Sequence, residues 1–404
     1  MSEDVVEQDR PDRERRATIA FTLHELGQGG TDRVCAHLAR GFAEAGFAVE
    51  LIVLFGGAPT TATMLSLIGD GVTVRALNER RGSRHLDRLI VLPRLVARLR
   101  ASAPDVVMST GNNMNWTTAL AFRLARLGSA RLMLKVTNPI VRAKDGPLRR
   151  WYRRLRYADA FGLSDAVLTL CDREAELLAA AFPASASRFQ PVVNPYVTPA
   201  MLAPCRELVG ERDMILAIGR LAPQKRFDLL IRAFAEVRAP GARLVILGEG
   251  PDRASLETLA RELGLDGRVT MPGYVADVGP WLRRVRLLAL SSRYEGLPAV
   301  VLEAMASGCP VVATDCFLAA RTLVGGAEGC AVVGEATPAA FARALEKCWS
   351  RERPTMLPAV AERYSVGEGV RSHVAAVRRL LDPVPGENAR QVALAVSARP
   401  AGRP

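Results

Sequence analysis

The chain has 404 residues, more than the ~250–300 at which one hydrophobic core stops growing, so we expect two domains. Hydrophobic residues make up 49% and charged residues 24%, which excludes a largely disordered chain. No run reaches the ~18 apolar residues of a membrane-spanning helix, and the apolar stretch at residues 17–23 is too short for a signal peptide, so we expect a cytoplasmic protein. The seven cysteines include no C-x-x-C pair, which favours free thiols over disulfides or a zinc site.

The net charge of +12 favours an anionic partner: a nucleic acid, a membrane surface or a phosphorylated ligand. Only 5% of the residues are aromatic and no nucleic-acid-binding motif is present, so we expect no nucleic acid partner. Residues 17–195 carry 23 basic and 14 acidic side chains, a net charge of +9. The positive charge is therefore concentrated in the first half of the chain.

The first half alternates short apolar runs with amphipathic stretches. Residues 17–23 predict a strand, the glycines at 27, 29 and 30 a tight loop, and residues 31–45 a helix that Gly46 ends. Further strands are predicted at 49–54, 72–76, 105–109, 132–136 and 166–170. This repetition predicts a parallel sheet covered by helices.

Prolines punctuate residues 193–210, and a second alternating series follows them. It predicts strands at 214–218, 243–247, 269–271, 285–289 and 311–313, and helices at 227–237, 255–264 and 300–307. The resulting division is a tail (1–16), one α/β domain (17–195), a second (196–365), a helix that packs back toward the first domain (366–382) and a flexible tail (383–404). Two such domains joined by a hinge form a cleft, which is a common place for ligands.

Two loops between a strand and a helix could bind an anion. Gly29 and Gly30 allow close approach of a ligand to the N–H groups of a helix N-terminus, although a plain tight turn explains them as well. In the second domain Gly219 and Arg220 follow the first strand, and Lys225 precedes the next helix. Two cations beside a helix N-terminus suit a diphosphate, whereas the alternative is a solvated charged loop.

The most specific pattern is Glu295-Gly-Leu-Pro-Ala-Val-Val-Leu-Glu303, which follows an apolar strand. Pro298 fits the first turn of a helix, so Glu295 lies in the preceding loop and Glu303 about one and a half turns into the helix. Both carboxylates can then face one pocket beside the N–H groups of Ala299 and Val300. The helix is apolar nearly all round, so Glu303 needs a partner.

Together these motifs resemble the family-4-type retaining glycosyltransferases of the GT-B fold, over about residues 17–380. The resemblance implies two Rossmann-like domains with parallel sheets facing an interdomain cleft. It implies that Arg220 and Lys225 hold the diphosphate of a nucleotide sugar, Glu303 the ribose hydroxyls and Glu295 the donor sugar. Further implied donor contacts are Gly29, Gly30, Gly219, Tyr274, Val275, Leu297, Ala299 and Val300. No metal and no cofactor are expected, and UDP is expected as the nucleotide rather than GDP.

The sequence departs from the family pattern in two loops. Many members have a histidine where this chain has Ser109 to Asn115, and many have a glycine-rich turn where it has Cys316 to Arg321. The second departure leaves open whether this turn contacts the donor. The asparagine-rich loop resembles the branch that builds lipid-linked glycans and cell-surface polysaccharides, and it suggests acceptor contacts at Asn112, Asn113 and Asn138.

Residues 142–157 combine seven basic side chains with Trp151, Tyr152 and Tyr157. Such a segment can dock on anionic lipid headgroups, at the inner face of the cell membrane. The alternative is a helix that packs through Trp151, Leu155 and Ala158 and leaves its arginines in solvent. The basic residues are Arg142, Lys144, Arg149, Arg150, Arg153, Arg154 and Arg156.

The sequence thus predicts a retaining, metal-independent glycosyltransferase that moves a hexose or hexosamine from a nucleotide diphosphate sugar to a lipid-linked or polysaccharide acceptor. Arg220, Lys225 and Glu295 are the expected catalytic residues. A nucleotide-sugar 2-epimerase and a non-catalytic nucleotide- or glycan-binding scaffold share the fold and remain alternatives. A nicotinamide dehydrogenase is disfavoured because no dinucleotide fingerprint is present.

Overall fold

The computed structural model describes residues 16–27, 29–56, 62–78, 86–140, 146–202, 213–351 and 356–382. The predicted tails, apart from Arg16, lie outside the described residues. So do Arg142 and Lys144 of the basic segment and residues 203–212 in the region of the predicted hinge.

The first sheet has seven parallel strands in the order β3-β2-β1-β4-β5-β6-β7. Apart from the edge strands β3 and β7, its apolar strands are largely buried on both faces, as expected of a parallel sheet between two helical layers. The strands are β1 (Thr18–Glu25), β2 (Ala48–Phe55), β3 (Val72–Ala76), β4 (Val106–Ser109), β5 (Arg131–Lys135), β6 (Ala166–Thr169) and β7 (Phe189–Pro191).

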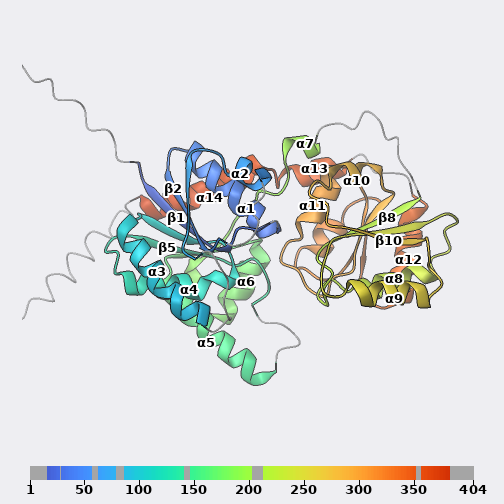
Figure 1. The fold of residues 1–404 in the computed structure, drawn as a ribbon, viewed down its shortest axis with the longest axis horizontal. Coiled ribbons are helices and arrows are strands. Elements are labelled where there is room, and N and C mark those ends of the chain that lie inside the picture. The colour runs from blue at the N-terminus through green and yellow to red at the C-terminus, as the bar shows by residue number, and fades with distance from the viewer. Residues whose placement is uncertain are drawn as a thin grey trace, which may run out of the picture.

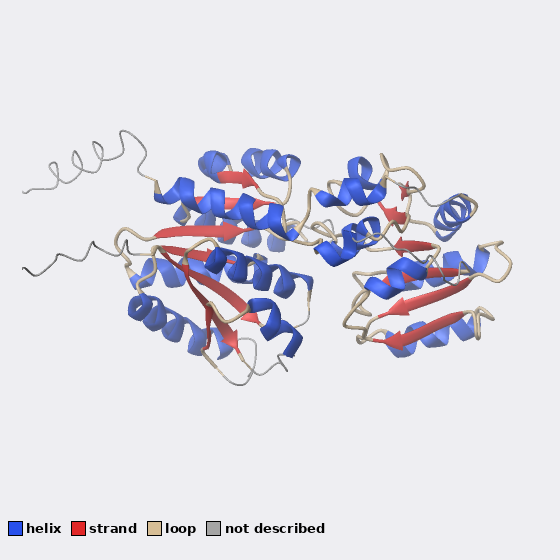
Figure 2. Ribbon diagram, turned by 90° about the horizontal axis from the view of Figure 1, so that it is seen from above, coloured by secondary structure: helices blue, strands red, loops and turns tan. Residues whose placement is uncertain are grey.

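Helices cover both faces of this sheet (Figures 1 and 2). Residues of α1, α2 and the C-terminal α14 form the core on one face, and residues of α3 to α6 form it on the other. The helices are α1 (Gly30–Glu44), α2 (Ala62–Ile68), α3 (Leu86–Ser102), α4 (Asn112–Ala125), α5 (Pro147–Leu163), α6 (Asp172–Ala181), the 3₁₀ helix η1 (Pro183–Arg188) and α14 (Val366–Leu381).

The second sheet has six parallel strands in the order β10-β9-β8-β11-β12-β13. The strands are β8 (Met214–Ile218), β9 (Arg243–Leu247), β10 (Val269–Gly273), β11 (Leu287–Leu290), β12 (Val311–Thr314) and β13 (Ala331–Val333). The helices are α8 (Phe227–Glu236), α9 (Arg253–Glu262), α10 (Gly279–Arg284), α11 (Ala299–Ala306), the π-helical turn η2 (Ala320–Val324), α12 (Pro338–Trp349) and α13 (Leu357–Glu362), with α7 (Pro199–Leu202) in the connection. α8, α9 and α12 pack on one face, and α10, α11 and α13 on the other.

The chain crosses between the two sheets twice. It leaves the first after β7, and it returns after α13 through α14, which packs against α1. At the crossing, Val197 pairs with Ser365 in a parallel bridge, and the N–H groups of Tyr196 and Val197 both donate to the carbonyl of Tyr364. The two crossing segments therefore support each other.

The main departures from the predicted elements occur in short or outlying segments. The strand predicted at 285–289 runs from Leu287 to Leu290, because Val285 instead caps the end of α10. The edge strands β7 and β13, of three residues each, were not predicted. In α5 the alternative reading, packing through Trp151 and Leu155, is wrong, since these side chains are 59% and 49% exposed.

Candidate functional site

A cavity of about 580 Å³ lies between the two domains. Its walls come from the segments that follow β1, β4, β5 and β7 in the first sheet, and β8, β9, β10 and β11 in the second. Because the strands in each sheet are parallel, their carboxyl ends bring these loops together at one edge. The cavity collects thirteen of the residues singled out from the sequence: Gly29, Gly30, Asn138, Gly219, Arg220, Lys225, Tyr274, Val275, Glu295, Leu297, Ala299, Val300 and Glu303.

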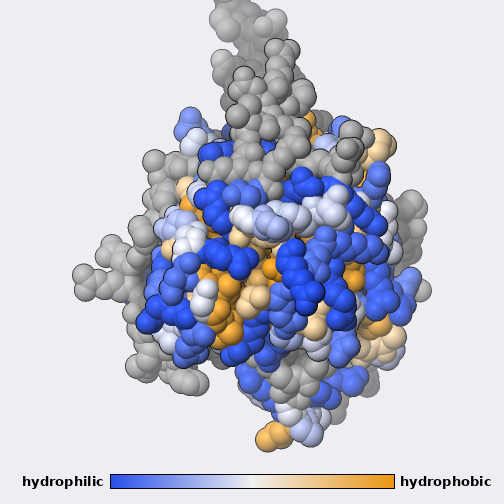
Figure 3. Space-filling model, turned by 90° about the vertical axis from the view of Figure 1, so that its right-hand side faces the viewer, coloured by the Kyte–Doolittle hydropathy of each residue, from blue (hydrophilic) through white to orange (hydrophobic). Residues whose placement is uncertain are grey.

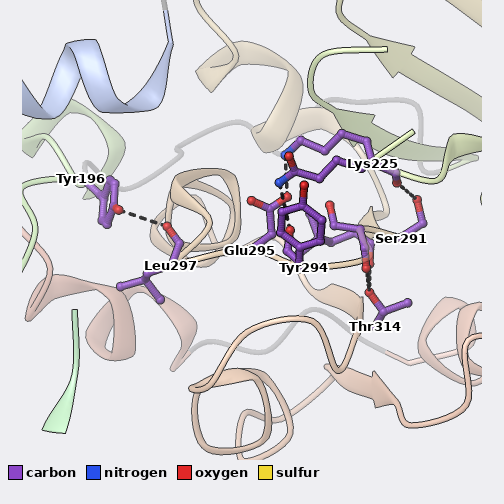
Figure 4. Close-up of polar contacts among 10 residues, drawn as sticks. Tyr196, Lys225, Ser291, Tyr294, Glu295, Leu297 and Thr314 are labelled. Carbon is purple, nitrogen blue, oxygen red and sulfur yellow. Dashed lines mark hydrogen bonds and ion pairs between the residues drawn. The ribbon is translucent and has the colours of Figure 1, made fainter. Parts of the chain in front are cut away.

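Lys225 and Glu295 face each other across the second-domain side of the cavity (Figure 4). The Lys225 Nζ donates to Glu295 Oε1 at 2.8 Å, and Ser291 Oγ donates to the Lys225 carbonyl at 2.8 Å. The lysine stem lies over Gly219, where an added Cβ would come within 2.9 Å of Lys225 Cε. Gly219 also has a φ of +154°, so both its backbone and its lack of a side chain serve this arrangement.

Helix α11 points its N-terminus at the cavity. It begins at Ala299, so Pro298 caps the helix instead of occupying its first turn as predicted. Every residue from Val300 to Ala306 is buried, and Glu303 is the fifth residue of the helix. The N–H groups at the very start of the helix, on Ala299 and Val300, and the helix dipole favour an anion at this end.

Glu303 has a partner that the sequence did not reveal. The Nη2 of Arg33, on α1 of the first domain, lies 2.5 Å from Glu303 Oε1. The Glu303 side chain is 3% exposed, and that of Arg33 is 33% exposed and lines the cavity. The expectation that a carboxylate in this apolar helix needs a partner is confirmed. The sequence indicated which residue this partner is only weakly, by an arginine in the first turns of the helix that follows the Gly29-Gly30 loop.

The Gly29-Gly30 loop brings a second helix N-terminus to the cavity. Asp32 Oδ2 accepts from the Gly29 N–H at 3.0 Å and closes the start of α1. Burial raises the pKa of Asp32, while this N–H and that of Gly27 act in the opposite direction. A Cβ on Gly30 would lie 3.9 Å from the Cβ of Ala299, so α1 and α11 begin beside each other.

The loop before α11 is held against the first domain. An added Cβ on Gly296 would lie 1.9 Å from the Thr137 carbonyl oxygen, so only glycine allows this approach. The Tyr196 hydroxyl donates to the Leu297 carbonyl at 3.0 Å (Figure 4) and accepts from Asn194 Nδ2 at 2.7 Å. Burial raises the pKa of Tyr196, which keeps its hydroxyl a donor.

The remaining predicted residues differ in their placement. Arg220 and Tyr274 are exposed and line the cavity. Asn112 does not line it: its side chain donates to the Asn138 carbonyl and accepts from the Thr137 N–H, both at 2.7 Å, and so shapes the loop that does. Asn113 is exposed outside the cavity. An acceptor contact at any of these asparagines stays a prediction.

The described residues also bear on two other classes of site, a metal centre and a membrane span. No group of three or more His, Cys, Asp or Glu side chains in that part of the chain is arranged to hold a metal ion. Within the same residues, no helix combines the length and the apolar character needed to cross a membrane. The six cysteines described are free thiols.

Comparison with known proteins links each domain to a family model. The model of the glycosyl transferase 4-like domain matches residues 29–195, and that of the glycosyl transferases group 1 matches residues 212–351. The lipopolysaccharide core biosynthesis glycosyltransferase LpsE of Rhizobium meliloti is 28% identical over 80% of this chain and 87% of its own length. The amylovoran biosynthesis glycosyltransferase AmsD of Erwinia amylovora is 25% identical over 71% and 78%.

Solved structures agree with this assignment at the level of the fold. Anabaena HepE in complex with UDP and glucose superposes with a TM-score of 0.70 at 18% identity, over 90% of this chain and 100% of that one. The sucrose-phosphate synthase of Thermosynechococcus elongatus gives 0.74 at 17% identity, over 91% and 99%. The predicted fold class, with two Rossmann-like domains facing a cleft as in GT-B proteins, is confirmed.

Proposed function

Because the chain belongs to the glycosyltransferases of the GT-B fold, we propose that it transfers a hexose or hexosamine from a nucleotide diphosphate sugar to a lipid-linked or cell-surface polysaccharide acceptor, with retention of configuration. The observation that carries the proposal is the convergence of Arg220, Lys225, Glu295 and Glu303 on one cavity beside the N-terminus of α11. Cations and free N–H groups suit a diphosphate, and carboxylates suit sugar hydroxyls.

The donor would lie along the second-domain wall of the cavity. Arg220 and Lys225 hold the diphosphate next to the first turn of α11, Glu303 accepts from the ribose hydroxyls, and Tyr274 and Val275 border the base. Glu295, oriented by Lys225, accepts from the donor sugar. UDP is the preferred nucleotide in this proposal, in keeping with the UDP complexes of HepE.

The chemical step breaks the bond between the sugar C1 and the diphosphate oxygen and forms the bond to the acceptor oxygen on the same face. The acceptor proton passes to the departing diphosphate, so no protein nucleophile is needed. Arg220, Lys225 and the α11 N–H groups stabilise the negative charge that develops on the diphosphate. These groups supply the charge compensation that a divalent ion supplies elsewhere, and we therefore expect metal-independent transfer.

The acceptor class rests on the relatives. LpsE and AmsD are named for lipopolysaccharide core and amylovoran biosynthesis, and both match more than two thirds of this chain. A lipid-linked acceptor also requires an approach to a membrane, and α5 offers a surface for it. Helix α5 extends away from the rest of the first domain (Figure 1), and its free end carries hydrophobic surface beside hydrophilic surface at the bottom of Figure 3.

The exposed face of α5 has the pattern of an interfacial helix. Near its C-terminal end it packs into the domain through Tyr157, Ala160 and Phe161. Four apolar or aromatic side chains at i, i+3, i+4 and i+7 lie on the opposite side, 49–77% exposed: Leu148, Trp151, Tyr152 and Leu155. The helix contains five arginines and one acid, Asp159, so its charge complements an anionic lipid surface.

The transfer reaction is tested by supplying UDP- and GDP-sugars with a membrane extract or lipid-linked acceptor and measuring release of the nucleoside diphosphate. The anomeric configuration of the product is read by NMR. Acceptor-dependent release with retention is the expected result. Release or epimerisation without acceptor would instead support the 2-epimerase, and nucleotide binding without turnover of any donor would support the non-catalytic scaffold.

The membrane contact is tested with vesicles of neutral and anionic lipid at low and high salt. Arg150→Gln with Arg154→Gln, two exposed positions on α5, should weaken binding to anionic vesicles by about 2 kcal/mol, or roughly thirtyfold. The matched control is Arg321→Gln with Arg371→Gln, whose side chains are each 76% exposed and lie far from α5 in sequence. Equal binding by both double variants would contradict a docking role for α5.

A further inference from the structure

Each acid of the Glu295–Glu303 motif is paired with a cation, and the two pairs differ in origin. Lys225 and Glu295 belong to the same domain, with Nζ and Oε1 2.8 Å apart. Arg33 and Glu303 come from opposite domains, with Nη2 and Oε1 2.5 Å apart. The carboxylate assigned to the ribose is thus contacted from the domain that does not hold the nucleotide.

Glu303 depends on this contact more than a surface acid would. Every residue of its helix from Val300 to Ala306 is buried, and the Glu303 side chain itself is only 3% exposed. Burying a carboxylate without a partner is costly, and fixing a glutamate side chain costs rotamer entropy. A charge-assisted bond from Arg33 offsets both costs and aims the carboxylate at the cavity.

The pair leaves room for a ribose. Arg33 uses one carboxylate oxygen, whereas a carboxylate offers about four lone-pair sites. The hydroxyls of a ribose can therefore bind to Glu303 while Arg33 stays in place. Arg33 also compensates the negative charge of Glu303, which would otherwise repel the diphosphate in the same cavity.

We propose that Arg33 is a positioning residue for nucleotide recognition: it orients and neutralises Glu303 from across the cleft, so the ribose contact is complete only when the two domains meet. This inference rests on the proposed function, because it assumes a nucleotide on the second domain. It makes ribose recognition a property of both domains. The start of α1, held by the Asp32 cap, sets the position of the arginine.

Calorimetry with UDP and 2′-deoxy-UDP as probes separates this role from a purely structural one. Wild type should bind UDP about tenfold more tightly than the deoxy probe, the value of one hydrogen bond to a charged group at about 1.4 kcal/mol. Arg33→Gln should weaken UDP binding tenfold or more, because the ribose contact is lost and the uncompensated Glu303 repels the diphosphate of both probes, and it should bring the ratio of the two affinities close to one. Arg33→Lys, which keeps the charge, should recover most of the ratio and shows that the variants fold.

The control and the double variant complete the design. Arg40→Gln on the same helix, whose partner Glu44 is exposed, should leave both affinities unchanged. Arg33→Gln combined with Glu303→Gln should bind UDP no more weakly than Glu303→Gln alone, since Arg33 acts through Glu303.

Several results would overturn the inference. Additive losses in the double variant would mean that Arg33 contacts the nucleotide itself. If the ratio of the affinities for UDP and 2′-deoxy-UDP is unchanged or larger in Arg33→Gln, Arg33 either plays no part in ribose binding or competes with the ribose. Both of these results are compatible with the proposed function. Failure of wild type to bind any nucleoside diphosphate, in contrast, would overturn the proposed function and this inference with it.

Discussion

A lysine buried in the first domain makes the stability of this protein depend on pH in an unusual direction. Lys135 ends β5 and is 1% exposed, and its Nζ lies 2.8 Å from Nε2 of His373, which is fully buried on α14. The His373 Nδ1 lies 2.8 Å from the Gly369 carbonyl oxygen, which can only accept. Nδ1 therefore carries the proton, and Nε2 accepts from Lys135.

Burial disfavours the charged form of both side chains. It lowers the pKa of Lys135 to about 7, while Cys35 acts in the opposite direction. It also lowers the pKa of His373 well below its ordinary value, and the charge of Lys135 adds to that effect. A lowered pKa means that the folded state binds its proton less tightly than the unfolded state does.

The direction of the pH effect follows from this difference. Below pH 7 both states hold the Lys135 proton, and the folded state bears the full cost of the buried charge. Between about pH 7 and 10.5 the unfolded state keeps a proton that the folded state has lost, so the free energy of unfolding rises with pH. The full change is roughly 4–5 kcal/mol, with a slope of at most about 1.4 kcal/mol per pH unit.

The test is urea unfolding of wild type and Lys135→Met between pH 7 and 9.5. Methionine fills similar space without a titrating group, and any cost of leaving His373 Nε2 without a donor is the same at each pH. The free energy of unfolding of wild type minus that of the variant should rise by about 3 kcal/mol over this range. Lys347→Met, at an exposed position on α12, is the control and should run parallel to wild type.

Two outcomes would refute the reasoning. A constant difference between wild type and Lys135→Met would show that the buried lysine loses no proton in the folded state over this range. A difference that falls with pH would show that the folded state instead stabilises the lysine charge.

Three further predictions concern the candidate site. Lys225→Ala and Arg220→Ala should each lower kcat/KM by roughly 10²–10³, because each removes a charge beside the leaving diphosphate; a loss below about threefold in both would remove them from the site. Transfer should survive EDTA, and restoration of a lost activity by a divalent ion would contradict metal independence. Gly296→Ala should lower kcat/KM by about 10², since its Cβ would lie 1.9 Å from the Thr137 carbonyl oxygen and force the domains apart. Gly334→Ala, with nothing within 4 Å, is its control, and equal activity of the two variants would exclude this effect.

Much of the fold was predictable because it rests on local patterns. Parallel strands buried on both faces appear as continuous apolar runs, and glycines or prolines mark their ends. The edge strands β7 and β13 escaped prediction because three residues carry too little pattern to stand out. For α5 the sequence left two readings open, an outward and a packed apolar face, because an amphipathic period indicates that a helix has an apolar side, but not whether another element covers it.

In the candidate site, too, only the residues that are placed by local pattern could be predicted. Residues whose position follows from a nearby strand end, such as Lys225 and Glu295, could be placed from the sequence, because the strand, the glycine and the helix start are all local. Arg33 and Glu303 are 270 positions apart in the chain, and they meet only because α1 and α11 begin beside each other across the cleft. Likewise, Lys135 and His373 are 238 positions apart and meet only because α14 returns to the first domain. A pattern read along one segment predicts that a buried charge needs a partner, as it did for Glu303, but the partner's identity depends on how two domains close on each other.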